Sequence, residues 1–219
     1  MEQPKILVGI PTTGLLDVSF VKALLPLVGD PRLYPQFEVS ALVHESRGKL
    51  AVDAVVNRYD YLLFIDSDMI FNVDDIDRLL SHGKDIVGAN YLKRTWPYVP
   101  TAQVHYNIEH PEDGEQLNAD IPGLYEVDMI ATGFLLIKTV ALGTIILDSQ
   151  VNPFLPLNGL GEDWSFCVRA RSAGYSIWAD NDLDIGHLGQ VVVTRETAAR
   201  ISQASFVTTV NSLFKGTLT

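Results

Sequence analysis

The sequence contains one cysteine, Cys167, among 219 residues, so it cannot form an internal disulfide. This excludes the small disulfide-stapled class of secreted protein and fits a reducing cytoplasm. It also has no apolar run near the roughly 20 residues that a membrane-spanning helix needs. The apolar start is broken at Pro11 and Gly14, too early for a secretion signal. We therefore expect a soluble cytoplasmic protein without a membrane span.

Basic residues are scarce, with 16 Lys and Arg against 27 Asp and Glu, which gives a formal charge of −11. A strongly acidic chain is a poor match for broad binding to nucleic acid or anionic membrane, because both need a positive surface. The hydrophobic fraction of 47% and charged fraction of 20% are those of a globular protein, not a disordered one. We expect a single domain over residues 1–219, long enough to bury about 70% of its unfolded surface.

Strands and helices alternate in the first ninety residues. Apolar runs predict strands over 5–10, 37–43, 61–65 and 85–89, and helical periodicity predicts helices over 17–28, 49–58 and 73–82. The order β-α-β-α-β-α-β predicts a parallel sheet with right-handed crossovers. The run YLLFI at 61–65 is continuously apolar, as expected for a central strand that is covered on both faces.

The pattern changes near residue 91, which marks a seam within the domain. Proline and polar residues over 91–128 indicate loops and short antiparallel strands. Beyond them we expect a strand at 134–137, helices at 139–147 and 161–174, short strands at 176–179 and 183–185, and an amphipathic helix at 195–214. The apolar face of that last helix is a candidate contact between two copies of the chain.

Asp66 and Asp68 follow the most apolar strand. In extended chain, side chains two residues apart point to the same side, about 6.6 Å from one another. Two such carboxylates can converge on one divalent cation, and oxygen ligands favour Mg²⁺ or Mn²⁺. The C-terminal ends of parallel strands are also where open α/β sheets bind ligands. The alternative interpretation is a solvated turn after a strand.

Two further segments carry candidate groups. Asp163, beside Glu162 and Trp164, can take a proton from an attacking hydroxyl, or can simply complement the positive end of the helix at 161–174. Trp164 can stack on a sugar or belong to the core. His187 lies between glycines in Gly186-His-Leu-Gly189, where a neutral imidazole can complete an Asp/Asp/His metal site or serve a structural role.

The order of these segments resembles small glycosyltransferases of the GT-A fold, of the family-2-like type common in bacteria and their phages. The segments that carry the resemblance are YLLFIDSDMIFN (61–72), DIVGANYLKR (85–94), VDMIATGFLLIK (127–138), GEDWSFCVRARSAGY (161–175) and GHLG (186–189). It implies an α/β, Rossmann-like, mostly parallel sheet flanked by helices, with a small mixed or antiparallel part on the acceptor side. The implied organisation is a nucleotide-sugar-binding half at 1–90, an acceptor and catalytic half at 91–190, and a C-terminal helix at 191–219.

The resemblance also implies a role for each candidate residue. Asp66, Asp68 and His187 would bind Mn²⁺ or Mg²⁺. The nucleotide-sugar donor would contact Pro11, Thr12, Thr13, Gly14, Arg47, Asp66 and Ser67, with Lys93 and Arg94 as candidate cations near its diphosphate. Asp163, with Glu162 beside it, would be catalytic, and Thr132, Gly133 and Trp164 would face the acceptor.

The expected activity is metal-dependent transfer of a sugar from a UDP- or GDP-sugar to an acceptor hydroxyl, in the cytoplasm of a bacterium or of a phage host. The acceptor stays open among a glycan, a small alcohol, a protein and a modified nucleic-acid base. Three alternatives use the same residues: a haloacid-dehalogenase-like phosphatase, a nucleotidyltransferase, and a sugar-nucleotide-binding module without catalysis.

Overall fold

The structure is a computed structural model that describes residues 3–110, 113–157 and 159–190. The chain up to Leu188 forms one compact unit. The helix expected at 195–214, and the pairing of two copies through it, lie outside the described residues. Within the described ranges, no helix has the length and apolarity required to cross a bilayer.

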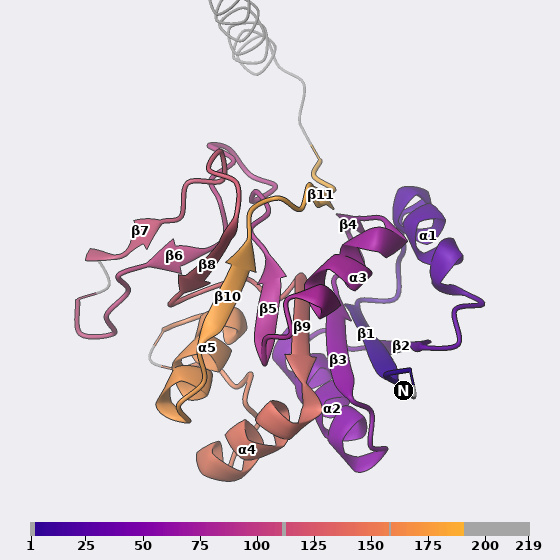
Figure 1. The fold of residues 1–219 in the computed structure, drawn as a ribbon, viewed down its shortest axis with the longest axis horizontal. Helices are drawn as coiled ribbons and strands as arrows, with labels where there is room; N and C mark the ends of the chain where they lie inside the picture. Colours follow the sequence, from indigo (N-terminus) through magenta and orange to yellow (C-terminus); the bar gives the residue numbers. More distant parts are fainter. Residues whose placement is uncertain (1–2, 111–112, 158, 191–219) are drawn as a thin grey trace, which may run out of the picture. The chain divides into compact units, whose positions relative to one another are not determined.

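In the described part of the chain, seven strands form a central sheet in the order β2-β1-β3-β9-β5-β10-β8 (Figure 1). The strands are β1 (Ile6–Thr12), β2 (Leu33–Val39), β3 (Tyr61–Ile65), β5 (Ile86–Ala89), β8 (Leu124–Val127), β9 (Phe134–Lys138) and β10 (Ile177–Asp180). Five strands run in one direction, while β8 and β9 run in the other. Two small antiparallel sheets pair β4 (Met69–Ile70) with β11 (Gly186–His187) and β6 (Gln103–Val104) with β7 (Glu115–Gln116). The predicted α/β class with a mostly parallel sheet is confirmed.

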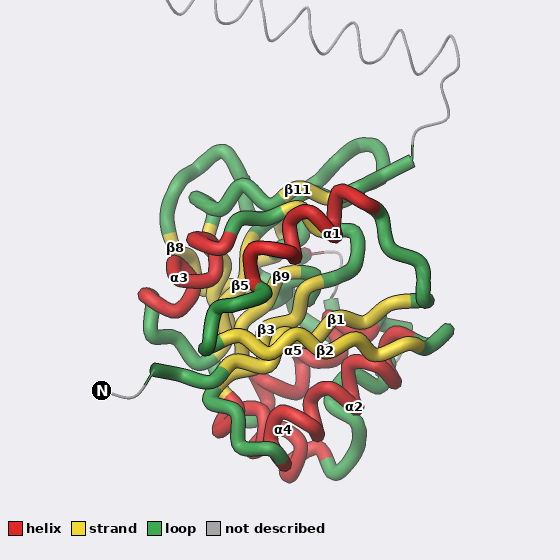
Figure 2. Tube along the Cα trace, turned by 90° about the vertical axis from the view of Figure 1, so that its right-hand side faces the viewer, coloured by secondary structure: helices red, strands yellow, loops and turns green. Residues whose placement is uncertain are grey.

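Helices cover both faces of the sheet (Figure 2). One face carries α2 (Val43–Val56), α4 (Thr139–Ser149) and α5 (Glu162–Ser172), and the other carries α1 (Val18–Leu24), a 3₁₀ turn (Leu25–Leu27) and α3 (Val73–Ser81). Leu62 and Phe64 of β3 pack on the first side, and Leu63 and Ile65 pack on the second. Burial on both faces explains why the sequence of β3 is continuously apolar.

The four strands predicted in the first ninety residues run in one direction, as expected, but an antiparallel strand is inserted between two of them. Strands β3 and β5 are not neighbours, because β9 lies between them and runs antiparallel to both. The strand expected at 37–43 is Leu33–Val39, and Pro35 is tolerated because β2 is an edge strand. The helix expected at 49–58 begins earlier, at Val43. Residues 183–185 lie outside any strand, and the next two residues make the pairing as β11.

Asp180, the last residue of β10, is a fully buried carboxylate that ties α3 to the sheet. Arg78 Nε donates to it at 2.6 Å, and His82 Nε2 lies 2.7 Å from the same oxygen. Burial alone would raise the pKa of Asp180, but these hydrogen bonds outweigh it and hold the pKa below its usual value. Asp180 is thus ionised and paired at neutral pH.

We expect Asp180→Ala to lower the free energy of unfolding by roughly 2–3 kcal/mol in urea denaturation, because it removes the hydrogen bonds that this buried carboxylate makes with Arg78, His82 and the Asp182 amide. Asp85→Ala is the matched control, since Asp85 forms an exposed ion pair with Lys138 that is worth less than about 1 kcal/mol. Equal losses in the two variants would contradict a stabilising role for Asp180.

Candidate functional site

Asp66, Ser67 and Asp68 lie where β3 ends, and the reversed direction of β9 brings a second segment to the same place. Ile65 pairs with Phe134, the first residue of β9. The Asp66 amide donates to the Gly133 carbonyl at 2.9 Å. Asp66 and Thr132-Gly133 are far apart in the sequence, but they therefore meet where the C-terminal end of β3 lies beside the start of β9.

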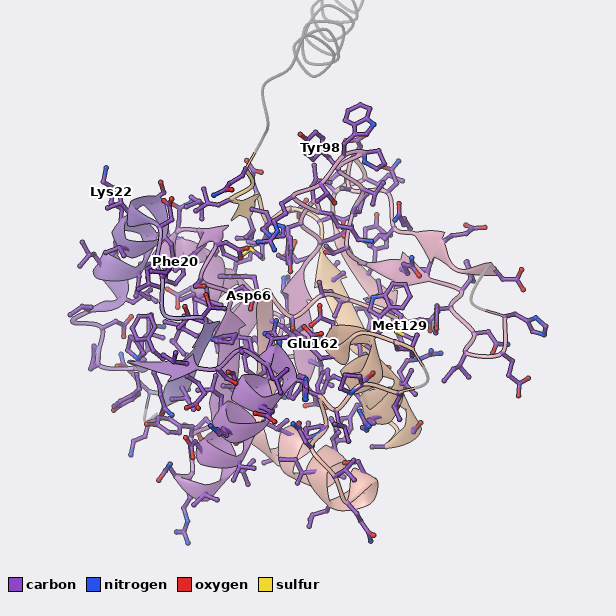
Figure 3. The ribbon with its side chains drawn as sticks, turned by 180° about the vertical axis from the view of Figure 1, so that it is seen from behind. Phe20, Lys22, Asp66, Tyr98, Met129 and Glu162 are labelled. Atoms are coloured by element: carbon purple, nitrogen blue, oxygen red, sulfur yellow. The ribbon has the colours of Figure 1, made fainter. Side chains whose placement is uncertain are left out.

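Arg47, on α2, is a buried cation surrounded by carboxylates and only 2% exposed. Its Nη2 lies 3.0 Å from Asp66 Oδ1 and 3.7 Å from Asp163 Oδ1, and its Nε lies 3.9 Å from Glu162 Oε1. Figure 3 shows Asp66 and Glu162 in the middle of the molecule, from β3 and α5. A buried charge is costly unless paired, and the three acids raise the pKa of Arg47 in spite of its burial. Its predicted contact with a nucleoside stays a prediction.

Asp163 lies in the first turn of α5 and accepts a hydrogen bond from Thr132 Oγ1. Burial raises the pKa of Asp163 to about 6, with Arg47 opposing the shift and Glu162 adding to it. A carboxyl group with such a pKa can exchange a proton near neutral pH. The alternative interpretation, that Asp163 only complements the positive end of α5, explains why an acid stands at this position. It does not explain the hydrogen bond that Asp163 accepts from Thr132. Glu162 lacks that contact.

His187 reaches Asp68 through the pairing of β11 with β4, which sets His187 opposite Met69. His187 Nε2 lies 3.4 Å from Asp68 Oδ2, and the Arg94 guanidinium pairs with the same oxygen. Burial alone would raise the pKa of Asp68, but His187 and Arg94 hold it below its usual value. On the other ring nitrogen, Nδ1 donates to the Leu92 carbonyl at 3.1 Å, because a carbonyl can only accept.

Asp66, Asp68 and His187 carry donor atoms of the kinds that bind Mn²⁺ or Mg²⁺. Asp66 Oδ1 is buried and accepts no hydrogen bond, although Arg47 Nη2 lies nearby. Burial alone would lower the pKa of His187, but the contacts with Asp68 and with the Leu92 carbonyl raise it. In the neutral form with the proton on Nδ1, the ring would offer its Nε2 lone pair to a cation, which is the tautomer of a metal ligand. As placed, no three His, Cys, Asp or Glu side chains within the described residues form a group that could hold a metal ion. The structure brings Asp68 and His187 together, while Asp66 pairs with Arg47.

A cavity of about 340 Å³ opens beside these acids. Its lining residues come from the ends of β1, β2 and β3, the start of α2 and the segment after β5: Pro11, Thr12, Thr13, Ser40, Ala41, Val43, Ser46, Asp66, Ser67, Asp68 and Arg94. The cavity thus gathers the predicted loop at 11–13 with Asp66, Ser67 and Asp68, while Gly14 and Arg47 are not on its wall. Ser46 contributes to the cavity wall, and its buried hydroxyl has no hydrogen-bond partner within the described residues.

Tyr91 is a site residue that the sequence analysis missed. It is buried, and its hydroxyl accepts a hydrogen bond from the Gly133 amide at 3.1 Å. A Cβ at Gly133 would lie 2.3 Å from Tyr91 Oη and 2.5 Å from Met69 Cε, which explains a glycine there. Nothing in the spacing of Tyr91 reveals this contact, because Tyr91 and Gly133 meet only through the insertion of β9.

The three residues expected to face an acceptor are largely explained by packing. The Thr132 side chain is fully buried against Asp163. Trp164 is half-buried, with its ring 5.2 Å from that of Tyr106. The acceptor contacts of Thr132, Gly133 and Trp164 therefore stay predictions.

No protein-family model and no curated protein matches the sequence. Among solved structures, the chain is similar to the crystal structure of A197 from STIV, with a TM-score of 0.54 and 17% identity. The similarity covers 87% of this chain and 97% of that one. At this identity the likeness concerns the fold, and it extends over nearly the whole of A197.

Proposed function

We propose that this protein is a metal-dependent glycosyltransferase that transfers a sugar from a UDP- or GDP-sugar to an acceptor hydroxyl. The observation that carries the proposal is the cavity, in which the last two residues of β1, Pro11 and Thr12, and the following Thr13 meet Asp66, Ser67 and Asp68. The α/β fold agrees with the one that the GT-A resemblance implies. Asp163, which is not on the cavity wall, would supply the base that the transfer needs.

The donor would occupy the cavity, with its nucleoside near the hydroxyl groups of Thr12, Thr13 and Ser46 and its diphosphate toward Asp68. Asp68, His187 and Asp66 would hold the cation. When bound, a divalent cation offsets the negative charge that develops on a departing diphosphate. Arg94, 55% exposed and paired with Asp68, is placed to turn toward the phosphates and add positive charge there.

Asp163 would act as the base. An acceptor hydroxyl is a weak nucleophile until a positioned carboxylate takes its proton, an effect of typically 10²–10⁴-fold. The hydrogen bond from Thr132 fixes the orientation of the Asp163 carboxylate. Arg47 links Asp163 to Asp66, so the base and the donor acids are held in one arrangement.

The pKa of Asp163 predicts an acid limb in the pH profile. Because the base must be ionised, log kcat/KM should rise with unit slope up to about pH 6 and level off above it. We expect this limb to disappear from the residual activity of Asp163→Asn, measured from pH 5 to 8. An unchanged limb in that variant would assign the titration to another group.

Nucleoside diphosphate release tests the function. The protein should release UDP or GDP from at least one of UDP-glucose, UDP-galactose, UDP-N-acetylglucosamine and GDP-mannose with Mn²⁺, and EDTA should abolish the release. Phosphate release from p-nitrophenyl phosphate would favour a phosphatase, and pyrophosphate release from a nucleoside triphosphate would favour a nucleotidyltransferase. Donor binding without turnover in any metal would favour a binding module. The position of Asp66 after the third strand opposes the phosphatase, whose motif normally follows the first strand.

A further inference from the structure

Residues 92–100 form a closed turn that presents two aromatic rings to solvent. Leu92 and Pro100 make an antiparallel bridge, and the Lys93 amide donates to the Val99 carbonyl at 2.9 Å. Trp96 is 59% exposed and Tyr98 is 40% exposed. Their ring centroids lie 5.7 Å apart and the rings are nearly perpendicular, at 88°. The turn thus holds the rings of Trp96 and Tyr98 edge to face, and we call this pair the aromatic corner.

The base of this turn belongs to the candidate site. The Leu92 carbonyl accepts the hydrogen bond from His187 Nδ1, and Arg94 pairs with Asp68. Trp96 follows Arg94 by two residues, so the turn that carries the aromatic corner is joined to the candidate site through Leu92 and Arg94. Figure 3 shows Tyr98 at the rim of the molecule, whereas Asp66 lies in its middle.

The exposure of Trp96 sets it apart from the other tryptophans of the chain, all three of which are described. Trp164 packs on Tyr106, and Trp178 lies under Lys84 Nζ at 3.4 Å. A large aromatic ring left in water forgoes the free energy of burial. Beside a site for sugar chemistry, such a ring is suited to a ligand that has an apolar face and polar edges.

We propose that Trp96 and Tyr98 bind the pyranose rings of a carbohydrate acceptor. A pyranose presents C–H groups on its face and hydroxyl groups at its edge, which match the face and the polar edge of Trp and Tyr. A membrane is the poorer match, because the chain carries a net charge of −11 and Arg94, a cation of this turn, is paired with Asp68. The inference rests on the proposed function and names the acceptor class for the same site.

The test measures binding of three hexasaccharides (cellohexaose, maltohexaose and chitohexaose) by saturation-transfer NMR and titration calorimetry, without donor. Wild-type protein should bind at least one of them. Trp96→Ala and Tyr98→Ala should each weaken that binding by about tenfold, the loss of one aromatic contact. Phe37→Ala is the matched control, since Phe37 is 42% exposed on the edge strand β2, and it should bind as wild type does.

The proposal is overturned if no hexasaccharide binds, or if binding is equal in Trp96→Ala. Trp96-dependent binding to phosphatidylcholine/phosphatidylglycerol vesicles without sugar binding would instead identify a membrane contact. Release of UDP or GDP from donor in the absence of acceptor is measured on the same variants and should be unchanged. If wild-type protein releases neither UDP nor GDP from any donor, the proposed function is wrong. That result is independent of the hexasaccharide titration, which tests the acceptor proposal alone.

Discussion

Replacing Asp68 with alanine should lower kcat/KM for sugar transfer by about a thousandfold or more, while the protein remains folded. Asp68 meets His187 Nε2 at 3.4 Å and pairs with Arg94, so its carboxylate is the centre of the proposed cation site. The cation contributes several kcal/mol to the stabilisation of the departing diphosphate, and each 1.4 kcal/mol corresponds to about a factor of ten. Removal of a principal ligand should cost most of that contribution.

The measurement compares transfer rates over a range of Mn²⁺ concentrations, with thermal unfolding as the check on folding. Asp30→Ala is a suitable control, because Asp30 also pairs with an arginine, Arg32. Asp30 lies before the N-terminal end of β2, whereas the candidate site lies at the C-terminal end of that strand. That variant should keep wild-type turnover. Full activity in a folded Asp68→Ala protein would remove Asp68 from the metal site.

Asp163→Asn should lower kcat by roughly 10²–10⁴-fold and leave the affinity for donor unchanged. Asparagine retains an oxygen that can accept the hydrogen bond from Thr132, so the local structure should persist while the proton acceptor is lost. The raised pKa of Asp163 shows that burial disfavours its charge, so the stability that the protonated form contributes is lost as pH rises through about 6. The neutral asparagine should therefore not lower the melting temperature at pH 7.5.

Glu162→Gln separates the two adjacent acids. Glu162 lies 3.9 Å from Arg47 Nε and receives no hydrogen bond from Thr132. We expect its substitution to cost clearly less in kcat than Asp163→Asn, with donor affinity measured for both by calorimetry with UDP or GDP and Mn²⁺. An equal or larger loss in Glu162→Gln would make Glu162 the base, and an unchanged kcat in Asp163→Asn would leave Asp163 as a helix-end residue.

Much of the donor side could be predicted from local sequence. A continuously apolar run that ends abruptly in Asp-Ser-Asp predicts a central strand with acids at its end, and β3 with Asp66 and Asp68 has that form. The first strand could be predicted in the same way, because β1 is also a buried apolar run and ends close to Pro11. Both signals come from a single segment and need no knowledge of strand order.

The contacts that join distant segments could not be predicted in this way. The insertion of β9 between β3 and β5 sets Gly133 against Asp66 and Tyr91, and an apolar strand carries no mark of its neighbours. The burial of Arg47 among three acids depends on α2 and α5 meeting the end of β3. In the sequence, Arg47 is indistinguishable from a solvated cation on a helix.

Anomalous diffraction at the manganese edge tests the central claim most directly, on crystals grown with MnCl₂ and UDP or GDP. We expect one manganese peak that contacts Asp68 and His187, near the diphosphate of a nucleotide whose base lies in the cavity lined by Thr12 and Ser46. A nucleotide bound elsewhere, or a manganese ion that touches neither Asp68 nor His187, would contradict that claim.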